Sequence, residues 1–187
     1  MTTIALQKSR ARKAAKKTRA ALNTDGASQS LITHFPFADF PQAIVAGFWP
    51  LAGEIDILPL LGAFQSAGHK LALPCTPPVG EPLIFRQWML DEALKHGPYG
   101  TREPHAHVSE ISPTLVLLPL LAFSPDGKRL GYGGGFYDRT ISGLRERGEV
   151  FACGTAYAGQ ETSDIPTDQY DQRLDGILTE DYFRKFS

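Results

Sequence analysis

The segment RLGYGGGFYD, residues 129–138, is the part of this chain best suited to bind an anion. Glycine backbone adopts positive φ and lets a ligand approach closely, and a helix that starts near Phe136 would direct free N–H groups toward that ligand. Two phosphate-binding fingerprints do not fit, because GxGxxG would need glycine at position 136 and GxxxxGK[ST] is absent. On the glycines alone, a tight structural turn and a phosphate site are equally good interpretations.

Charged residues on either side of the glycines favour the phosphate interpretation. Arg129 precedes them, and a guanidinium can pair with phosphate oxygens. Asp138 follows in the first turn of the expected helix, where a carboxylate beside a nucleotide is suited to hold Mg²⁺. The alternative for Asp138 is a residue that the helix dipole favours at this position, with no role in metal binding.

A cluster of four aspartates occurs in and around IPTDQYDQRLD, before the last apolar segment. Most of its members are expected to be solvated or to cap turns. One of them could complete a metal site with Asp138 if the fold brings the two loops together. Spacing alone does not choose among Asp164, Asp168, Asp171 and Asp175.

The segment GFWPLAGEID, residues 47–56, is a candidate for binding an aromatic substrate. Phe48 and Trp49 can offer a flat apolar surface to a ring, and Glu54 can accept two hydrogen bonds from an amino-substituted heterocycle. The competing interpretation is structural, because Glu54 also stands near the expected first turn of a helix. The residues alone do not separate the two.

The first 22 residues are strongly basic, although the net charge of the chain is only -1. They contain seven of the nineteen Lys and Arg residues and no acid, so the remaining twelve basic and twenty acidic residues give -8 elsewhere. A solvated basic helix, a transit peptide, a nucleic-acid-binding arm and a helix that brings cations to a ligand phosphate are the possible interpretations. The lack of Ser-rich character argues against the transit peptide, and the lack of interleaved aromatic residues argues against nucleic acid.

Other signals exclude several classes of protein. No run of eighteen uncharged apolar residues occurs, so no membrane span is expected. Cys75 and Cys153 form no CxxC or Cys/His cluster, so neither a disulfide framework nor a structural zinc site is expected, and a cytoplasmic location fits best. His105 and His107 are expected to be loop residues, and neither GxSxG nor HExxH is present.

The apolar segments predict a layered α/β fold. Helices are expected at residues 4–22, with a narrow Ala-rich buried face, and at 28–35, 55–67 and 136–147, and strands at 43–48, 70–73, 83–89, 115–118, 150–156 and 175–178. Strands that alternate with helices favour a three-layer α/β/α domain with a mostly parallel sheet, whose ligands bind beyond the carboxyl ends of the strands. The 187 residues are expected to form a single domain.

Taken together, these segments resemble the 5-formyltetrahydrofolate cyclo-ligases, also called methenyltetrahydrofolate synthetases. The matching pieces occur in family order and span nearly the whole chain. They are KSRAR at 8–12, GEID at 53–56, YGTREP at 99–104, LPLLAFSPDGKRLGYGGGFYDR at 118–139 and IPTDQYDQRLDGILTE at 165–180. RLGYGGGFYD is the specific element among them.

The resemblance implies an ATP- and Mg²⁺-dependent closure of 5-formyltetrahydrofolate to 5,10-methenyltetrahydrofolate, with release of ADP and phosphate. ATP would phosphorylate the formyl oxygen, after which N10 attacks the activated carbon. Such chemistry depends on positioning and charge neutralisation more than on a nucleophilic side chain. The family's catalytic cations correspond to Lys8, Arg12 and Arg129, and its metal ligands correspond to Asp138 and Asp171.

The resemblance also implies which residues bind the two substrates. The nucleotide contacts are Lys8, Arg12, Arg129, Leu130, Gly131, Tyr132, Gly133, Gly134, Gly135, Phe136 and Tyr137. The folate contacts are Trp49 and Glu54, with Tyr132, Gly133, Gly134, Gly135 and Phe136 also near the substrate. Some members carry a lysine at the position of Gly134, so here Lys8, Arg12 or Arg129 would have to supply the cation for the transferring phosphate.

Two other classes of function compete with this one. A non-catalytic folate- or nucleotide-binding module would keep the fold, but decay should have removed some of Glu54, Arg129, Asp138 and Asp171, which are all present. A nucleic-acid-binding protein would use the whole basic first helix. The expected partners are therefore ATP and a folate, with no nucleic acid and no membrane, and the chain is expected to be a monomer.

Overall fold

A seven-stranded sheet forms the middle layer of the computed structural model, which describes residues 3–22 and 24–186. Across the sheet the strands are β11 (Phe183–Lys185), β10 (Gly176–Leu178), β9 (Phe151–Thr155), β6 (Leu115–Pro119), β1 (Val45–Ala46), β2 (Leu71–Cys75) and β3 (Ile84–Trp88). The five strands from β10 to β2 run parallel, whereas β3 and β11 pair antiparallel at the two edges. The sheet is mostly parallel, as the sequence predicted.

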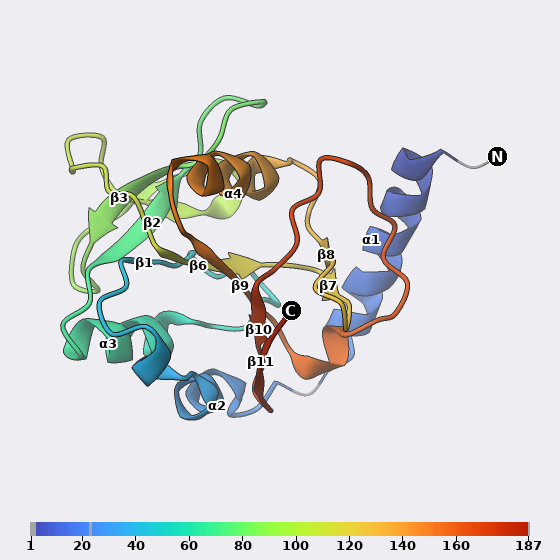
Figure 1. The fold of residues 1–187 in the computed structure, drawn as a ribbon, viewed down its shortest axis with the longest axis horizontal. Coiled ribbons are helices and arrows are strands. Elements are labelled where there is room, and N and C mark those ends of the chain that lie inside the picture. The colour runs from blue at the N-terminus through green and yellow to red at the C-terminus, as the bar shows by residue number, and fades with distance from the viewer. Residues whose placement is uncertain (1–2, 23, 187) are drawn as a thin grey trace.

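Helices cover both faces of this sheet (Figure 1). α2 (Ala27–His34) and α3 (Leu58–Ser66) lie on one face, and α4 (Phe136–Arg147) lies on the other. Along β6, Leu115 and Leu117 pack in the core beneath α2 and α3, while Val116 and Leu118 pack in the core beneath α4. All four side chains are buried, as expected for a parallel strand that is covered on both faces. The predicted three-layer α/β/α fold is confirmed.

α1 (Ile4–Ala20) lies outside the three layers, beside a hairpin formed by β7 (Ala122–Phe123) and β8 (Arg129–Leu130) (Figure 1). Ala11 and Ala15 of α1 are half-buried against a small cluster that includes Leu130. The observed buried face of α1 is narrower than predicted, because Ala14 and Thr18 are exposed. The helix also ends two residues before its predicted end. α1 therefore contacts the fold along one edge only.

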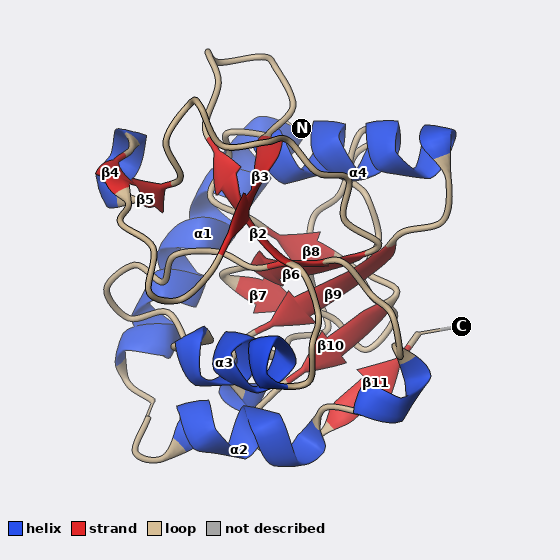
Figure 2. Cartoon of the chain, turned by 90° about the vertical axis from the view of Figure 1, so that its left-hand side faces the viewer, coloured by secondary structure: helices blue, strands red, loops and turns tan. Residues whose placement is uncertain are grey.

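Short elements complete the described part of the chain (Figure 2). A second hairpin pairs β4 (Lys95–His96) with β5 (Arg102–Glu103), and 3₁₀ turns occur at Phe37–Asp39 (η1), Pro98–Gly100 (η2) and Ala158–Gln160 (η3). No helix among residues 3–22 and 24–186 has the length and apolar character needed to cross a membrane.

Several predicted boundaries shift for local reasons. α3 begins at Leu58 rather than at residue 55, and Asp56 accepts the N–H of Leu58 at 2.9 Å in the turn that precedes the helix. Gly68, with φ 87°, follows the end of α3. The strand predicted at 43–48 is reduced to the two residues of β1, although the segment around it is largely buried.

Segments that leave the carboxyl ends of the parallel strands meet on one side of the sheet. Gln160, after β9, donates to the carbonyl oxygens of Leu120 and Leu121, after β6, at 3.0 Å each. The hydroxyl of Tyr157 lies 3.4 Å from the carbonyl oxygen of Glu54, which follows β1. The candidate site residues that follow these strands are thus brought to the predicted edge of the fold.

Candidate active site

A pocket of about 900 Å³ lies between α1, the start of α4 and the loop around residues 168–172. Residues 131–135, here called the glycine turn, line this pocket. The turn joins β8 directly to α4. The hairpin β7–β8 separates the turn from the buried strand β6.

Two of the glycines are needed for their backbone conformation. Gly133 has φ 105° and Gly135 has φ 68°, whereas Gly131 and Gly134 are not in the left-handed region. A Cβ atom on Gly133 would also lie 3.0 Å from Cζ of Arg12. The turn is therefore shaped by Gly133 and Gly135, and Gly133 lets α1 approach it.

We expect Gly133→Ala to destabilise the protein by about 1–3 kcal/mol, because alanine is strained at this φ. The free energy of unfolding in urea measures the effect. Gly148→Ala is the matched control, since Gly148 has an extended φ of 164° and open space around its Cβ position. Equal stability of the two variants would contradict this account of the turn.

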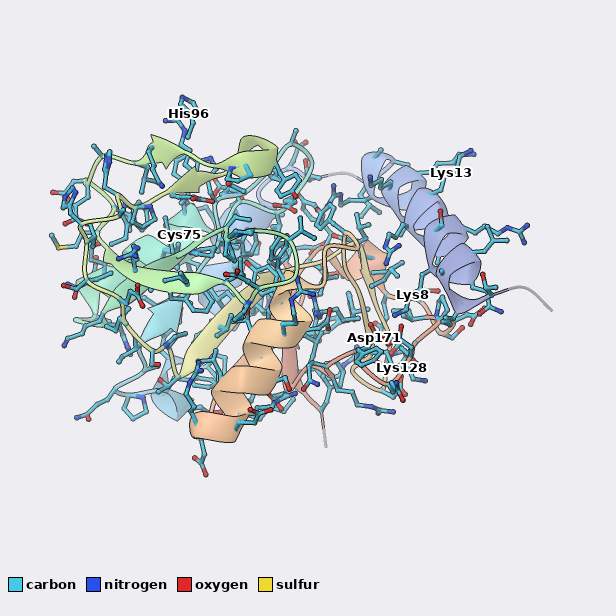
Figure 3. The ribbon with its side chains drawn as sticks, turned by 90° about the horizontal axis from the view of Figure 1, so that it is seen from above. Lys8, Lys13, Cys75, His96, Lys128 and Asp171 are labelled. Atoms are coloured by element: carbon cyan, nitrogen blue, oxygen red, sulfur yellow. The ribbon has the colours of Figure 1, made fainter. Side chains whose placement is uncertain are left out.

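Lys8 of α1 points into the pocket and meets the loop that follows η3. Its Nζ lies 2.6 Å from Oδ2 of Asp171 and 2.8 Å from Oδ2 of Asp168. Burial alone would lower the pKa of Lys8, but the hydrogen bonds to the two aspartates raise it above the ordinary value. Figure 3 shows Lys8 on the side of α1 that faces Asp171, with Lys13 on the far side. Lys8 is thus a cation held in place by two carboxylates.

Arg129 and Asp138 form an ion pair across the glycine turn. Nη2 of Arg129 donates to Oδ1 of Asp138, and the side chain of Arg129 is only 5% exposed. The same oxygen accepts the backbone N–H of Gln172 at 3.1 Å. The fold therefore brings Asp138 next to the loop that carries Asp171, as the metal-site prediction required.

Arg12 contacts the glycine turn from α1. Its Nε donates to the carbonyl oxygen of Gly131 at 3.0 Å. Arg12 lies one helical turn from Lys8, so both side chains project from the same face of α1. The pocket accordingly receives Lys8 and Arg12 from one helix and Arg129 from the hairpin.

Glu54 lies beside the pocket and is linked to it through Tyr132. The hydroxyl of Tyr132 donates to Oε1 of Glu54, while the backbone N–H of Leu51 donates to Oε2 at 2.8 Å. Arg19 of α1 donates to the Tyr132 oxygen at 2.6 Å. Burial raises the pKa of Glu54 above its ordinary value, although these donors and the charge of Arg19 oppose the shift. Burial and the Glu54 carboxylate also raise the pKa of Tyr132, which keeps its hydroxyl protonated.

Trp49 lies apart from the glycine turn. It is half-buried and does not line the pocket. The guanidinium of Arg102 from β5 covers its ring at 5.5 Å from the centroid. The surface that Trp49 was expected to offer to an aromatic ring is therefore already in contact with a cation.

No group of three or more His, Cys, Asp or Glu side chains that could hold a metal ion occurs in residues 3–22 and 24–186. The rings of His105 and His107 stack at 5.6 Å, in a loop. Asp138 and Asp171 line the same pocket, each with a cation as partner. Any metal held there would need oxygen ligands from elsewhere as well.

Comparison with known proteins decides the family. The model of the 5-formyltetrahydrofolate cyclo-ligase family matches residues 5–180, which include every predicted site residue. The chain belongs to this family. The resemblance inferred from its motifs is confirmed.

Individual relatives agree with this family assignment. The chain is 31% identical to a 5-formyltetrahydrofolate cyclo-ligase of Haemophilus influenzae over 72% of this chain and 74% of the relative. It is also 31% identical to the 5-formyltetrahydrofolate cyclo-ligase of Escherichia coli K12, over 72% of this chain and 76% of that relative. The solved structure of 5,10-methenyltetrahydrofolate synthetase from Aquifex aeolicus superposes on this chain with a TM-score of 0.75 at 27% sequence identity. The superposition covers 95% of this chain and 92% of the Aquifex chain.

Most of the site residues predicted from this cyclo-ligase resemblance come together in the pocket. Its lining includes Lys8, Arg12, residues 129–137, Asp138 and Asp171. Glu54 is reached through Tyr132, and Trp49 is not part of the lining. Most of the predicted residues thus line one pocket, and Glu54 is hydrogen-bonded to the lining residue Tyr132.

Three arginines beside the predicted site residues were not predicted from the sequence: Arg19, Arg102 and Arg139. Arg19 stands seven residues after Arg12, so helical periodicity could have placed it on the same face of α1. Arg102 lies in the YGTREP segment and contacts Trp49 only through the fold. Arg139 follows Asp138, and no pattern in the sequence distinguishes it from a solvated helix residue.

Proposed function

We propose that this cyclo-ligase family member converts 5-formyltetrahydrofolate to 5,10-methenyltetrahydrofolate and that ATP drives the reaction in the pocket described above. The observation that carries the proposal is the convergence of Lys8, Arg12 and Arg129 on one glycine turn at the start of a helix. Backbone N–H groups, guanidinium groups and an ammonium are the donors that bind a nucleotide's phosphate chain. The other predicted contacts, from Leu130 to Tyr137, would surround the nucleotide.

The folate is proposed to bind beside the nucleotide, toward Glu54. Glu54 accepts its present hydrogen bonds from Tyr132 and from the N–H of Leu51, so its carboxylate is positioned to accept hydrogen bonds from N–H groups of a heterocycle. Tyr132 lines the proposed nucleotide pocket, and its hydroxyl also donates a hydrogen bond to Glu54. Tyr132 would thus lie between the two substrates and help to align them.

Asp138 and Asp171 fit the requirements of Mg²⁺ as ligands. Mg²⁺ takes oxygen ligands and is usually held by one or two carboxylates together with waters and substrate phosphates. Both carboxylates face the pocket in which the phosphates would lie. When bound, Mg²⁺ would neutralise part of the charge on the phosphate chain.

The proposed reaction proceeds in two steps. In the first, a bond forms between the formyl oxygen and the γ-phosphorus of ATP while the bond from that phosphorus to ADP breaks. In the second, N10 attacks the formyl carbon and loses its proton, and the carbon–oxygen bond breaks to release inorganic phosphate. Lys8, Arg12 and Arg129 would stabilise the charge that develops on the transferred group, and Glu54 would hold the folate in line.

A direct assay tests this function. The protein is mixed with 5-formyltetrahydrofolate, ATP and Mg²⁺, and the near-ultraviolet absorbance of the methenyl product is followed. We expect a signal that requires the protein and ATP together. Absence of any signal above a protein-free control, from folded protein, would exclude the proposed activity.

Glu54→Gln should separate folate binding from nucleotide binding. We expect the KM for 5-formyltetrahydrofolate to rise about tenfold, because the change removes a charged hydrogen-bond acceptor. The KM for ATP should change less than about twofold, since Glu54 does not line the glycine-turn pocket. Steady-state kinetics with each substrate varied in turn measures both constants.

Glu149→Gln is the control for this substitution, because it makes the same chemical change at an exposed position distant in sequence. It should leave both constants unchanged. Equal increases of the two KM values in Glu54→Gln would reject the assignment of Glu54 to the folate.

A further inference from the structure

Arg139 is a charged residue of the pocket wall. It is the fourth residue of α4, and its side chain turns back toward the start of its own helix. Nη2 donates to the carbonyl oxygen of Gly134 at 2.8 Å, and Nε donates to that of Glu81 at 3.2 Å. Cζ lies 5.4 Å from the centroid of the Phe136 ring. Three contacts therefore fix the guanidinium against the glycine turn.

The charge of Arg139 has no carboxylate partner in the described parts of the chain. Both of its hydrogen-bond acceptors are carbonyl oxygens, and none of the salt bridges among these residues includes it. The first turn of a helix is also a position at which the helix dipole disfavours a cation. Neither an ion pair nor the helix dipole therefore stabilises the positive charge of Arg139. An anion bound in the pocket would stabilise it.

Arg12 shows the same arrangement at another part of the turn. It bonds to the carbonyl oxygen of Gly131 and likewise has no carboxylate partner in residues 3–22 and 24–186. Lys8 and Arg129, in contrast, are both engaged in ion pairs with aspartates. The glycine turn is thus contacted by two guanidinium groups whose charges the protein leaves uncompensated.

The donor geometry of Arg139 leaves room for a ligand. A guanidinium carries five N–H donors, and the two hydrogen bonds of Arg139 use one on Nη2 and the one on Nε. The remaining donors can pair with phosphate oxygens in the forked geometry that arginine favours. Contact with Phe136 orients the plane of the group before a ligand binds.

We propose that Arg139 is a further nucleotide-binding residue, which contacts the phosphate chain of ATP from α4 while Arg12 contacts it from α1. The inference rests on the proposed function, because it assigns a ligand contact within the same pocket. Arg139 acts here by binding and positioning the phosphates.

The affinity for ATP, measured by calorimetry in the absence of folate, tests the proposal. Arg139→Ala should weaken ATP binding about tenfold, because a charge-assisted pair is lost. Arg139→Lys should restore part of the affinity. The control is Arg147→Ala, which removes an exposed arginine from the other end of α4 and should leave the affinity within about twofold.

Arg139→Gln separates a charge contact from a purely structural one, and it replaces the alanine variant should that variant not fold. Glutamine can still donate to Gly134 but carries no charge, so its affinity should approach that of wild type as salt is raised. Wild-type affinity for ATP in Arg139→Gln at low salt would overturn the assignment of Arg139 but not the proposed function. The same holds for a loss of ATP affinity in Arg139→Ala that Arg139→Lys does not restore. Failure of the wild-type protein itself to bind ATP would instead overturn the proposed function.

Discussion

We expect Asp138→Asn to lower the turnover of 5-formyltetrahydrofolate by about 100-fold or more while the protein stays folded. The reason is that a carboxylate at the start of α4 is lost from the wall of the phosphate pocket, and contributions of this kind to charge stabilisation reach that size. Asparagine keeps an oxygen that can accept from Arg129 and from the N–H of Gln172. Initial rates at saturating substrates, together with a thermal melt, measure the two effects.

Alanine is the wrong replacement for isolating this role of Asp138. It would leave the Arg129 guanidinium, which is only 5% exposed, without its partner, and such a loss costs about 3 kcal/mol of stability. A drop in activity would then mix unfolding with lost chemistry. The comparison of Asp138→Ala with Asp138→Asn separates them, since the first should lower the melting temperature much more than the second.

Asp164→Asn is the matched control for Asp138→Asn. Asp164 belongs to the same acidic group in the sequence but is exposed and does not line the glycine-turn pocket. Its replacement should leave turnover within about twofold of wild type. Near-normal turnover of Asp138→Asn at modest Mg²⁺ concentrations would contradict the proposed metal role of Asp138.

Combined replacement of Lys8 and Arg12 by alanine should lower kcat/KM for ATP by about 100-fold. Each substitution removes one proposed charge-assisted contact to the phosphates, and two such contacts would account for a loss of this order. The matched variant carries Lys16→Ala with Lys17→Ala, which removes the same charge from exposed positions of the same helix. It should retain nearly full activity.

The same pair of double variants tests whether α1 is a nucleic-acid-binding arm. Binding to nucleic acid through the whole basic helix would depend on charge alone, so both pairs of substitutions would weaken it equally. Figure 3 already distinguishes the two sides of the helix, because Lys8 faces Asp171 and Lys13 faces away. Equal effects of the two variants on ATP-dependent turnover would refute the assignment of Lys8 and Arg12 to the nucleotide.

The layers of the fold could be predicted because their signals are local. The apolar run of β6 and the helix that starts at Phe136 each carry an unbroken pattern, and their observed bounds match the predicted ones within one residue. The hairpin β7–β8 was missed because its strands have two residues each, which is too short for an alternating pattern. β1 shows the opposite error, because the buried apolar segment predicted at 43–48 is longer than the two residues that pair as a strand.

The site was predictable only where a motif defined it. The glycine turn and Asp138 belong to one continuous segment, so their proximity follows from the sequence. The contact of Lys8 with Asp171 joins residues 163 positions apart, and spacing could not choose Asp171 from its acidic neighbours. Resemblance to the family supplied that choice, and the fold brings the two residues together. Arg139 had no such guide, because its proposed role depends on a side chain that turns back over its own helix.

The fate of the formyl oxygen tests the central claim most directly. 5-Formyltetrahydrofolate labelled with ¹⁸O in its formyl group is converted with ATP, and the released inorganic phosphate is analysed by mass spectrometry. Phosphorylation of the formyl oxygen in the glycine-turn pocket predicts one ¹⁸O atom in each phosphate released. Methenyl product accompanied by unlabelled phosphate would contradict the account.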